Sequence, residues 1–561
     1  MHRYAIGLDY GTNSCRSLLV DLDSGEELGS SVFPYPSGEL GVLVDPSDPN
    51  VARQNPQDYL DGLVAIVTGA LAQAKEARPD FDPAQVLGIG VDTTGSTPIP
   101  VDAEGTPLAL KPEFSGNLNA QVWLWKDHTS HAEAAAITET AARMRSQYLA
   151  KCGGTYSSEW WWSKIWRCLK VDPAVFHAAR SWVEHCDWLP AVLTGTTRPD
   201  LVRRGVCSAG HKAMYAADWG GLPDAEFLAA LDPALADLRG RLYDEAFPSD
   251  TKAGGLTPEW AAKLGLVPGT PVAVGAFDAH MGAVGAGVAP GTLVKILGTS
   301  TCDITVLPNA APLADVPGLC GVVDGSVLPG HHGIEAGQSA VGDIFLWFVN
   351  HLVPDSYGAT VAEKFAEMER RLATLKPGES GLLALDWNNG NRTVLVDVRL
   401  TGLLLGQTLH TEAHEIYRAL IEATAFGALT IIRRMEEYGI RIDRVVNTGG
   451  LAVKNATLMQ IYADILGRPL QVAASEQTCA LGAALFGAAC GGAISLEEAQ
   501  ATCCRTRELE YRPILGNEAV YREIYVLYET LHDAFGKSGW QGGLAHVMKE
   551  LIAIRQRQRG C

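Results

Sequence analysis

The sequence has no surplus of basic residues. Its 45 lysines and arginines stand against 64 aspartates and glutamates, so the formal net charge is -19 at pH 7. This balance argues against a nucleic-acid partner, because such a protein needs basic groups to neutralise phosphates and release their counterions. Small anionic ligands stay open, since backbone N–H groups and a metal ion can hold them locally.

Long apolar segments and paired cysteines are missing as well. No apolar run approaches the roughly 18 residues that span a bilayer. The N-terminal MHRYAIGLDY lacks the apolar region and cleavage site of a secretory signal. The 12 cysteines include no CxxC pair. We therefore expect no membrane partner, a cytoplasmic location, reduced and mostly buried thiols, and no structural zinc.

What the chain does contain is typical of a large α/β protein. At 561 residues it exceeds what one hydrophobic core usually supports, so we expect two domains. The 47% hydrophobic and 19% charged residues, with 59 glycines, indicate a globular α/β chain rather than a disordered one. We place the boundary near Gly285, which gives domains 1–285 and 286–561.

The first hundred residues predict a hairpin, a helix and a strand. Tyr4–Asp9 is a short apolar strand, Gly11–Ser14 a turn, and Cys15–Asp21 a second strand. Apolar residues at helical spacing follow in 56–77, behind a proline suited to a first helical turn. Residues 86–92, VLGIGVD, then predict a buried strand that again ends in an aspartate.

The same pattern returns after residue 285. TLVKILGTSTCDITVLP gives strand, glycine-hydroxyl turn and strand, so Gly298–Thr301 matches Gly11–Ser14 in a second half. A long helix ended by Gly439, a strand RVVNTGG, a helix opened by Asn455, a strand PLQVAAS and a helix CALGAALFGAACGG follow. Alternating strands and helices predict parallel or mixed sheets covered by helices, with ligands beyond the carboxyl ends of the strands.

Four tryptophans crowd the segment SSEWWWSKIWRCLK at 157–170. We interpret it as a helix on an aromatic core, and the alternative is a platform on which a ligand stacks.

The two glycine-hydroxyl turns are candidate phosphate sites. Glycine lets the backbone approach a ligand, and successive N–H groups in a tight turn bind anions. Asp9 beside the first turn would repel phosphate unless a cation such as Mg²⁺ lay between them. For a single such turn we favour a simple hairpin over a ligand site, but two turns in matching halves favour a functional role.

Other apparent motifs carry little weight. Gly536-Lys537-Ser538 resembles the end of a P-loop, but its context is helical and Leu531 stands where the first glycine belongs. The pairs His331-His332 and His128-x-x-His131 have no accompanying carboxylate or cysteine cluster, so we interpret them as surface or core histidines.

Several segments together resemble one family, from Ile6 to about Gly492. They are GLDYGTNSCRSLLVD, GVDTTGST, AFDAHMGAVGAG, LGTSTCDI, EAGQSAVGDIFLWFV and NTGGLAVKNATLMQIYADILGRPL. The chain resembles the FGGY carbohydrate kinases, and among them the L-ribulokinases, on GTSTC, EAGQSAVGD, KCGGTYSSEW and GHKAM.

The resemblance implies a fold and an activity. It implies two actin-like, ribonuclease-H-like lobes with ATP, Mg²⁺ and the sugar in the cleft between them. The implied reaction phosphorylates the terminal hydroxyl of a ketopentose, L-ribulose to L-ribulose 5-phosphate, with no partner besides the small-molecule sugar. A homodimer is implied only by family analogy.

The resemblance also implies roles for particular residues. The catalytic base would be Asp278, and the metal would be held near Asp9 and Asp278. The sugar would be bound by Gly95, Ser96, Lys212, Asp278 and Glu335. The nucleotide would be bound by Gly11, Thr12, Asn13, Arg16, Gly298, Thr299, Ser300, Gly337, Gln338, Gly449, Gly450 and Asn455.

The chain departs from the family pattern near the expected sugar pocket. It has 92–97 as DTTGST where many ribulokinases have DFTSCT or DFTACT, and His211 where they have tyrosine in GYKAM. D-Ribulose, xylulose or a pentitol such as ribitol are therefore alternative substrates. An actin-like ATPase and a catalytically inactive sugar sensor are remoter alternatives; intact Asp9 and Asp278 count against the sensor.

Overall fold

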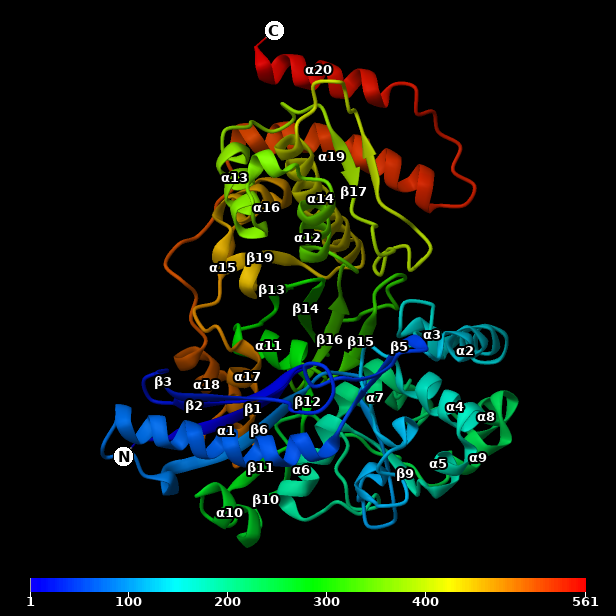
Figure 1. Ribbon diagram of the computed structural model, residues 1–561, viewed down its shortest axis with the longest axis vertical. Coiled ribbons are helices and arrows are strands. Elements are labelled where there is room, and N and C mark those ends of the chain that lie inside the picture. The colour runs from blue at the N-terminus through cyan, green and yellow to red at the C-terminus, as the bar shows by residue number, and fades with distance from the viewer. Residues whose placement is uncertain (1, 561) are drawn as a thin grey trace.

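The computed structural model describes residues 2–560 and folds them into two lobes, each built on a six-strand path of mixed sheet (Figure 1). The order in the N-terminal sheet is β10-β11-β6-β1-β2-β3, with β12 also paired to β6, and in the C-terminal sheet it is β15-β16-β14-β13-β19-β20. The N-terminal strands are β1 (Tyr4–Tyr10), β2 (Ser14–Asp21), β3 (Glu27–Pro34), β6 (Val86–Thr93), β10 (Lys252–Gly255), β11 (Pro271–Ala273) and β12 (Ala276–Phe277). The C-terminal strands are β13 (Gly291–Leu297), β14 (Thr301–Pro308), β15 (Gly321–Asp324), β16 (His331–Ala336), β19 (Ile442–Thr448) and β20 (Leu470–Val472).

The two sheets repeat one arrangement. β1 pairs antiparallel with β2 and parallel with β6, and β13 pairs antiparallel with β14 and parallel with β19. The predicted hairpins and the matching halves are confirmed. Because β1 and β13 occupy the same place in their sheets, their glycine-hydroxyl turns lie at equivalent edges.

The N-terminal sheet is covered by helices on both faces. α1 (Pro56–Ala77) begins as predicted, with Asn55 accepting a hydrogen bond from Gln57 N and proline in the first turn. It packs on β2 and β3, where the backbone of its Ala70 approaches Gly29, and its apolar residues share one core with Tyr4, Ile6 and Leu8 of β1. On the other face lies α17 (Thr478–Ala489), whose backbone approaches Gly7, Gly88 and Gly90 so closely that a Cβ would collide with it.

α17 comes from the C-terminal half of the chain yet packs on the N-terminal sheet. With α11 (Asp278–Gly285) it shares a core that reaches both sheets, including Ala5 and Val20 on one side and Val294 and Ile304 on the other. The two lobes are thus joined by a helix pair, and the chain crosses between them more than once.

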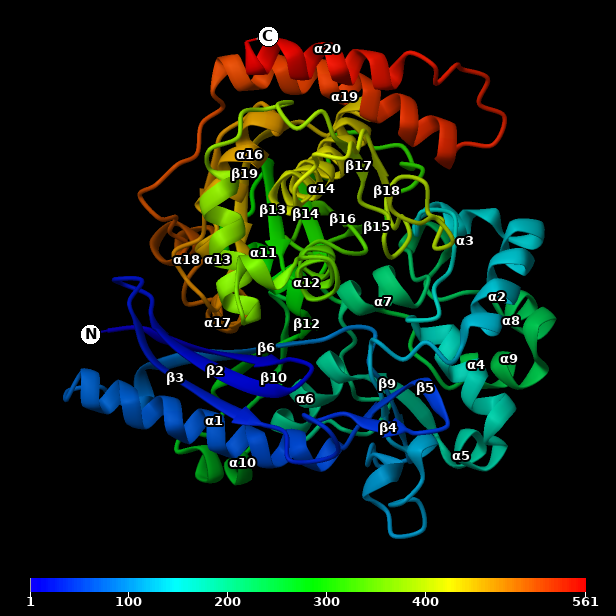
Figure 2. The same ribbon diagram turned by 45° about the horizontal axis from the view of Figure 1, so that its top comes forward.

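A helical subdomain with an aromatic core flanks the N-terminal sheet, at the right of Figure 2. Trp160, Trp161, Trp162 and Trp166 are buried in it, so the predicted helix on an aromatic core is confirmed. Its helices are α2 (His131–Met144), α3 (Ser146–Ala150), α4 (Trp161–Val171), α5 (Pro173–Ala178), α8 (Ala225–Leu231) and α9 (Pro233–Arg239). Between it and the sheet lie α6 (His185–Thr194) and α7 (Val206–Lys212), with small strands β4 (Leu43–Asp45), β5 (Asp48–Gln54), β7 (Pro98–Val101), β8 (Val122–Trp123) and β9 (Ser181–Glu184). α10 (Pro258–Leu264) lies away from the subdomain and packs against α1.

Helices also cover the C-terminal sheet (Figure 1). They are α12 (Gly342–His351), α13 (Val361–Leu372), α14 (Ala413–Glu437), α15 (Gly450–Lys454), α16 (Ala456–Leu466), α19 (Leu515–Gly536) and α20 (Val547–Arg559), with the strand pair β17 (Leu383–Leu385) and β18 (Leu403–Leu405). α18 (Leu496–Cys503) instead packs on α17 and α11. α14 ends just before Gly439 and Asn455 caps α16, as predicted. The short helix α15 was not predicted, because the glycine turn before it hides its start.

The P-loop lookalike and the cysteines lie as the sequence predicts. Gly536 is the last residue of α19, which confirms the helical context of the P-loop lookalike. Within residues 2–560 the cysteines are free thiols and most are buried, and no helix there is long and apolar enough to cross a membrane.

Candidate functional site between the lobes

Three aspartates meet at the carboxyl edge of the N-terminal sheet. In the parallel pair β1 and β6, Asp9 stands opposite Asp92, and one residue further Thr93 stands opposite Phe277 of β12. Asp278 follows Phe277 directly. Adjacent strands that end together therefore bring the predicted Asp9 and Asp278 to one edge, and they add Asp92, which the sequence analysis did not assign to the site.

This carboxylate cluster, Asp9, Asp92 and Asp278, has too little positive charge around it. Arg16 Nε lies 3.4 Å from an Asp9 oxygen, but neither carboxylate oxygen of Asp92 has a hydrogen-bond partner. Burial raises the pKa of both Asp9 and Asp92 above the ordinary value, and Asp9 raises that of Asp92 further. Buried acid oxygens without donors fit a hard divalent cation such as Mg²⁺.

Asp278 opens α11 rather than capping it from outside. Phe277 is the cap residue, and the Ala279 N–H donates to the Asp278 carboxylate at 2.7 Å. Burial, followed by the charge of Asp9, raises the pKa of Asp278 to about 7. A carboxylate with a pKa near neutrality is suited to accept a proton.

The N-terminus of α17 joins this edge to the C-terminal sheet. Cys479 lies beside Asp9 and Asp92, with one ligand atom of each within 4.8 Å of the others. The hydroxyls of Thr478 and Thr448, the last residue of β19, are 3.1 Å apart. The carboxyl edges of both sheets thus meet where α17 begins, and its dipole favours negative charge there.

Lys212 and Glu335 form a buried ion pair across the lobes. Lys212 ends α7 and Glu335 lies on β16, and the ammonium nitrogen is 3.2 Å from both carboxylate oxygens. Burial alone would lower the pKa of Lys212, but Glu335 raises it above its ordinary value. Against the effect of burial, Lys212 lowers the pKa of Glu335. Trp160 lies 5.1 Å below the ammonium, so a residue of the aromatic core reaches this pair.

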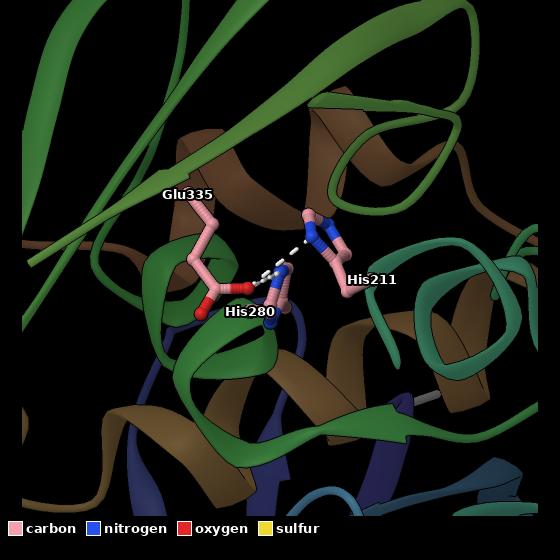
Figure 3. Close-up of side chains that lie close together, drawn as sticks. All are labelled: His211, His280 and Glu335. Atoms are coloured by element: carbon pink, nitrogen blue, oxygen red, sulfur yellow. Dashed lines mark ion pairs between the residues drawn. The ribbon is translucent and has the colours of Figure 1, made fainter. Parts of the chain in front are cut away.

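Two histidines complete the cluster around Glu335 (Figure 3). His211 Nδ1 lies 3.2 Å and His280 Nε2 3.7 Å from one Glu335 oxygen. Burial lowers the pKa of His280 to about 4 and that of His211 well below its ordinary value. His211 was expected near the sugar pocket only as a departure from GYKAM, and His280 was not predicted, although it follows Asp278 in FDAH.

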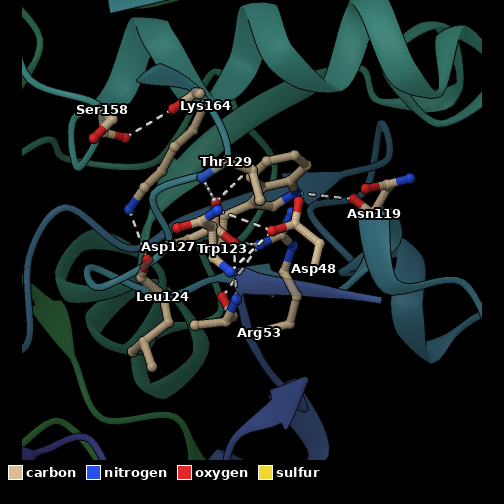
Figure 4. A network of polar contacts seen from close by, with 12 residues as sticks. Asp48, Arg53, Asn119, Trp123, Leu124, Asp127, Thr129, Ser158 and Lys164 are labelled. Carbon is tan, nitrogen blue, oxygen red and sulfur yellow. Dashed lines mark hydrogen bonds and ion pairs between the residues drawn. The ribbon is translucent and has the colours of Figure 1, made fainter. Parts of the chain in front are cut away.

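Gly95 and Ser96 follow β6 and are held by buried charges. The Ser96 hydroxyl bonds to the Glu184 carboxylate, and Lys164 Nζ donates to Ser96 O at 2.8 Å. Lys164 Nζ also donates to Leu124 O at 2.7 Å (Figure 4). Burial lowers the pKa of Lys164 to about 7. The Cα of Gly95 faces the Phe277 ring without room for a Cβ.

The neighbouring loop that carries Trp125 is fixed by a second buried pair. Arg53 and Asp127 form an ion pair beside Trp123, and Asp127 also accepts from Thr129 (Figure 4). Trp125 Nε1 donates at 3.0 Å to the hydroxyl of Thr12 in the first turn. This network links the first turn to the segment that holds Ser96.

The first turn, Gly11–Ser14, is closed by Gly11 N donating to Ser14 O at 3.0 Å. Asn13 Nδ2 donates to Leu40 O, so its amide is already engaged, whereas the Thr12 hydroxyl keeps its own hydrogen.

The second turn, Gly298–Thr301, lies against other predicted nucleotide residues. Gly298 N donates to Ser300 O at 3.0 Å, and Gly298 O accepts from Gly342 N at 3.1 Å. Gly449 packs on Leu297, and Leu451 reaches Gly342. The segments 298–300 and 449–450, about 150 residues apart in sequence, are therefore neighbours because β13 and β19 are parallel and end together.

Three other predicted nucleotide residues already have structural bonds. Gln338 uses its whole side-chain amide, accepting from Lys295 at 2.9 Å and donating to Asp386 and to Thr424 O. Gly337 N donates to Thr393 Oγ1 at 3.1 Å. Asn455 caps α16 at Leu458 N and contacts Glu369.

Sequence comparisons identify the family. The N-terminal domain of the FGGY family of carbohydrate kinases matches residues 4–285, and the C-terminal domain of that family matches 293–490. A ribulokinase of Shouchella clausii is 43% identical, covering 100% of this chain and 99% of that protein. A ribulokinase of Mycolicibacterium smegmatis is 39% identical, covering 96% and 94%.

Solved structures show the same fold at low identity. A xylulose kinase from Rhodospirillum rubrum superposes with a TM-score of 0.77 at 24% identity, covering 95% of this chain and all of that one. The Plasmodium falciparum glycerol kinase with ADP gives 0.75 at 15%, covering 95% and 98%. The predicted α/β fold with two actin-like lobes is confirmed. This chain belongs to the FGGY family of carbohydrate kinases.

Proposed function

We propose that this kinase transfers the terminal phosphoryl group of ATP to L-ribulose, giving L-ribulose 5-phosphate. The observation that carries the proposal is the buried Lys212–Glu335 pair beside Asp278, at the junction of the lobes. Full-length relatives named ribulokinase, at about 40% identity, support the substrate class.

Asp278 is the proposed general base. Its carboxylate would accept the proton of the reacting sugar hydroxyl, and a pKa of about 7 lets it do so near neutral pH. Phosphoryl transfer passes through a loose transition state and requires positioning and charge neutralisation more than covalent chemistry. The Ala279 N–H bond holds the carboxylate in place for this step.

The remaining roles are proposed from the family resemblance together with where the residues lie. Lys212, Glu335 and the segment 95–96 would pair the sugar hydroxyls. The turn 11–13 with Arg16, and the turn 298–300 with 449–450 and 455, would bind the nucleotide. Asp9, Asp92 and Asp278 would hold Mg²⁺, which neutralises phosphate charge when it is bound. We place sugar binding in 1–285 and most nucleotide binding in 286–561, with α17 of the second lobe reaching the first.

Water must be kept from competing with the sugar as phosphoryl acceptor. The ion pair from α7 to β16 crosses the lobes, so a sugar bound there contacts both and favours a closed arrangement.

One observation favours a different pentulose or a pentitol. His211 and the 92–97 segment lie at the proposed pocket and differ from the ribulokinase pattern, so ribitol and D-ribulose belong in the test as competing substrates.

The test compares kcat/KM for L-ribulose, D-ribulose, ribitol, xylulose and glycerol with MgATP. We expect L-ribulose first and glycerol far behind, because each buried polar group left unpaired costs about 1–3 kcal/mol. A higher kcat/KM for glycerol or xylulose would overturn the substrate assignment. ATP hydrolysis that no sugar stimulates would favour the actin-like ATPase.

A further inference from the structure

Three metal-ligating side chains converge next to the proposed sugar pocket. His211, His280 and Glu335 come from α7, α11 and β16, and one ligand atom of each lies within 4.8 Å of the others (Figure 3). The separations from Glu335 Oε2 are 3.2 Å to His211 Nδ1 and 3.7 Å to His280 Nε2. Ligand atoms of a tetrahedral zinc site stand about 3.3 Å apart, so little movement would bring these three around one ion.

One ring nitrogen of His211 has a hydrogen-bond partner and the other does not. His211 Nε2 lies 3.0 Å from Ser326 Oγ, and that hydroxyl is also 3.0 Å from Val323 O. His211 Nδ1 lies 3.2 Å from Glu335 Oε2 but is buried without a hydrogen-bond partner. This nitrogen is therefore available to bind a cation placed between the ring and the carboxylate.

His280 gives a second, independent sign of a missing ligand. The residue is only 2% exposed, yet neither ring nitrogen has a hydrogen-bond partner. A ring nitrogen so deeply buried without a partner is an available ligand atom for a cation. The neutral ring is the form that binds metal ions.

We propose that His211, His280 and Glu335 bind a divalent transition-metal ion such as Zn²⁺, and that this ion and the sugar exclude each other. The second half rests on the proposed function, which assigns Glu335 to the sugar. Two imidazoles and one carboxylate leave a fourth position open, as in catalytic zinc sites. Imidazole favours zinc and its neighbours, whereas Mg²⁺ prefers the all-oxygen carboxylate cluster.

Lys212 limits how tightly the ion binds. Its ammonium lies 3.2 Å from the other Glu335 oxygen and repels a second cation. We therefore expect weaker binding than at a structural zinc site, and reversible inhibition rather than a permanent metal.

Cobalt is the probe for the binding half of the proposal. Protein stripped with a chelator and dialysed is titrated with Co²⁺, and we expect visible absorption of a tetrahedral site to saturate at one equivalent. His211→Tyr and His280→Gln should each weaken binding at least tenfold, and Ser326→Ala, which keeps all three ligands, by about tenfold or more. His331→Gln, on the same strand as Glu335, is the matched control and should bind normally. Absence of the tetrahedral signal would overturn the site. So would a Co²⁺ affinity equal to the parent's in His211→Tyr and His280→Gln, provided that both variants melt like the parent.

Competition between the metal ion and L-ribulose is measured separately from metal binding. L-Ribulose should displace Co²⁺, and Zn²⁺ should raise the apparent KM for L-ribulose while leaving kcat unchanged at saturating sugar. Co²⁺ that binds but is not displaced would overturn the exclusion. Failure of the stripped enzyme to phosphorylate L-ribulose with MgATP would instead overturn the proposed function, while the cobalt titration still decides the metal site.

Discussion

The two polar clusters beside the first turn of α11 differ in charge: one is acidic, and in the other the charges are balanced. Asp9 has Arg16 as its ion-pair partner and neither oxygen of Asp92 is bonded, whereas Glu335 is matched by Lys212 at 3.2 Å and lies beside two histidines. Burial raises the pKa of acids in the first cluster, while Lys212 lowers that of Glu335 in the second. The difference separates two tasks: the acidic cluster needs a cation and can accept a proton, and the balanced cluster can pair neutral hydroxyls.

The largest expected effect is on the acidic side. Asp278→Asn keeps the size of the side chain but removes its charge and its ability to accept a proton. The protein should fold and bind nucleotide, while kcat falls by at least roughly 10²–10⁴-fold. Single-turnover phosphorylation of L-ribulose measures this, and a rate within a few fold of the parent would remove Asp278 from the mechanism.

Asp9→Asn is the matched contrast in the same cluster. It leaves the base intact, so the loss should appear as a higher Mg²⁺ requirement that added Mg²⁺ partly restores. Magnesium titrations of both variants test this division of roles. If added Mg²⁺ restores the two variants equally, Asp9 and Asp278 do not have different roles.

The balanced cluster is tested through its ion pair. Lys212→Met leaves the Glu335 carboxylate buried beside two neutral rings, which should cost about 3–5 kcal/mol in the free energy of unfolding. The double variant Lys212→Met/Glu335→Gln leaves no unpaired charge, so it should recover much of that stability. Urea unfolding with and without L-ribulose measures both.

Sugar binding should not recover in the double variant, because the charged partners of the hydroxyls are gone. Recovery of the KM for L-ribulose together with stability would show that the pair has only a structural role.

A buried histidine outside both clusters sharpens the contrast. His185 stacks on Tyr59 with ring centroids 3.8 Å apart, neither nitrogen is bonded, and burial lowers its pKa from 6.5 to about 3. As the pH falls below 6.5, His185 is protonated in the unfolded chain but stays neutral in the folded one. Its contribution to the free energy of unfolding is therefore complete above pH 6.5 and is lost progressively toward pH 3.

His185→Phe should remove that acid dependence. At about pH 4.5 the parent should lose about 2–3 kcal/mol of unfolding free energy, relative to neutral pH, that the variant keeps. Chemical denaturation at both pH values measures the difference, and parallel losses in the two proteins would mean that His185 is protonated in the folded state.

Sequence reasoning reached the parts of this site that local patterns determine. Both hairpins, the glycine turns and the strand-end aspartates follow from alternation, glycine and position. Asp92, His211 and His280 were not given roles because their partners come from other elements. The pairing of β1 with β6 brings Asp92 to Asp9, and the packing of α7 against β15 brings His211 to the second lobe. Likewise, the apolar pattern of α17 predicts a helix, but it does not predict that this helix packs on the sheet of the other lobe.

The smallest expected effect concerns the second glycine turn. A Cβ at Gly298 would meet only Ser300 O, at 3.7 Å, so Gly298→Val should fold without a clash inside the protein. The added methyl groups would occupy space that a phosphate needs next to the turn, and we expect the Kd for ATP to rise about tenfold, or about 1.4 kcal/mol. The affinity for L-ribulose should stay nearly the same, because the sugar residues lie at α7, α11 and β16 rather than at this turn. Calorimetry with a non-hydrolysable ATP analogue measures the first quantity and L-ribulose titration the second. Unchanged nucleotide affinity in a folded variant would place the phosphates elsewhere, whereas equal loss for both ligands would mean that the turn sets the arrangement of the lobes rather than touching phosphate.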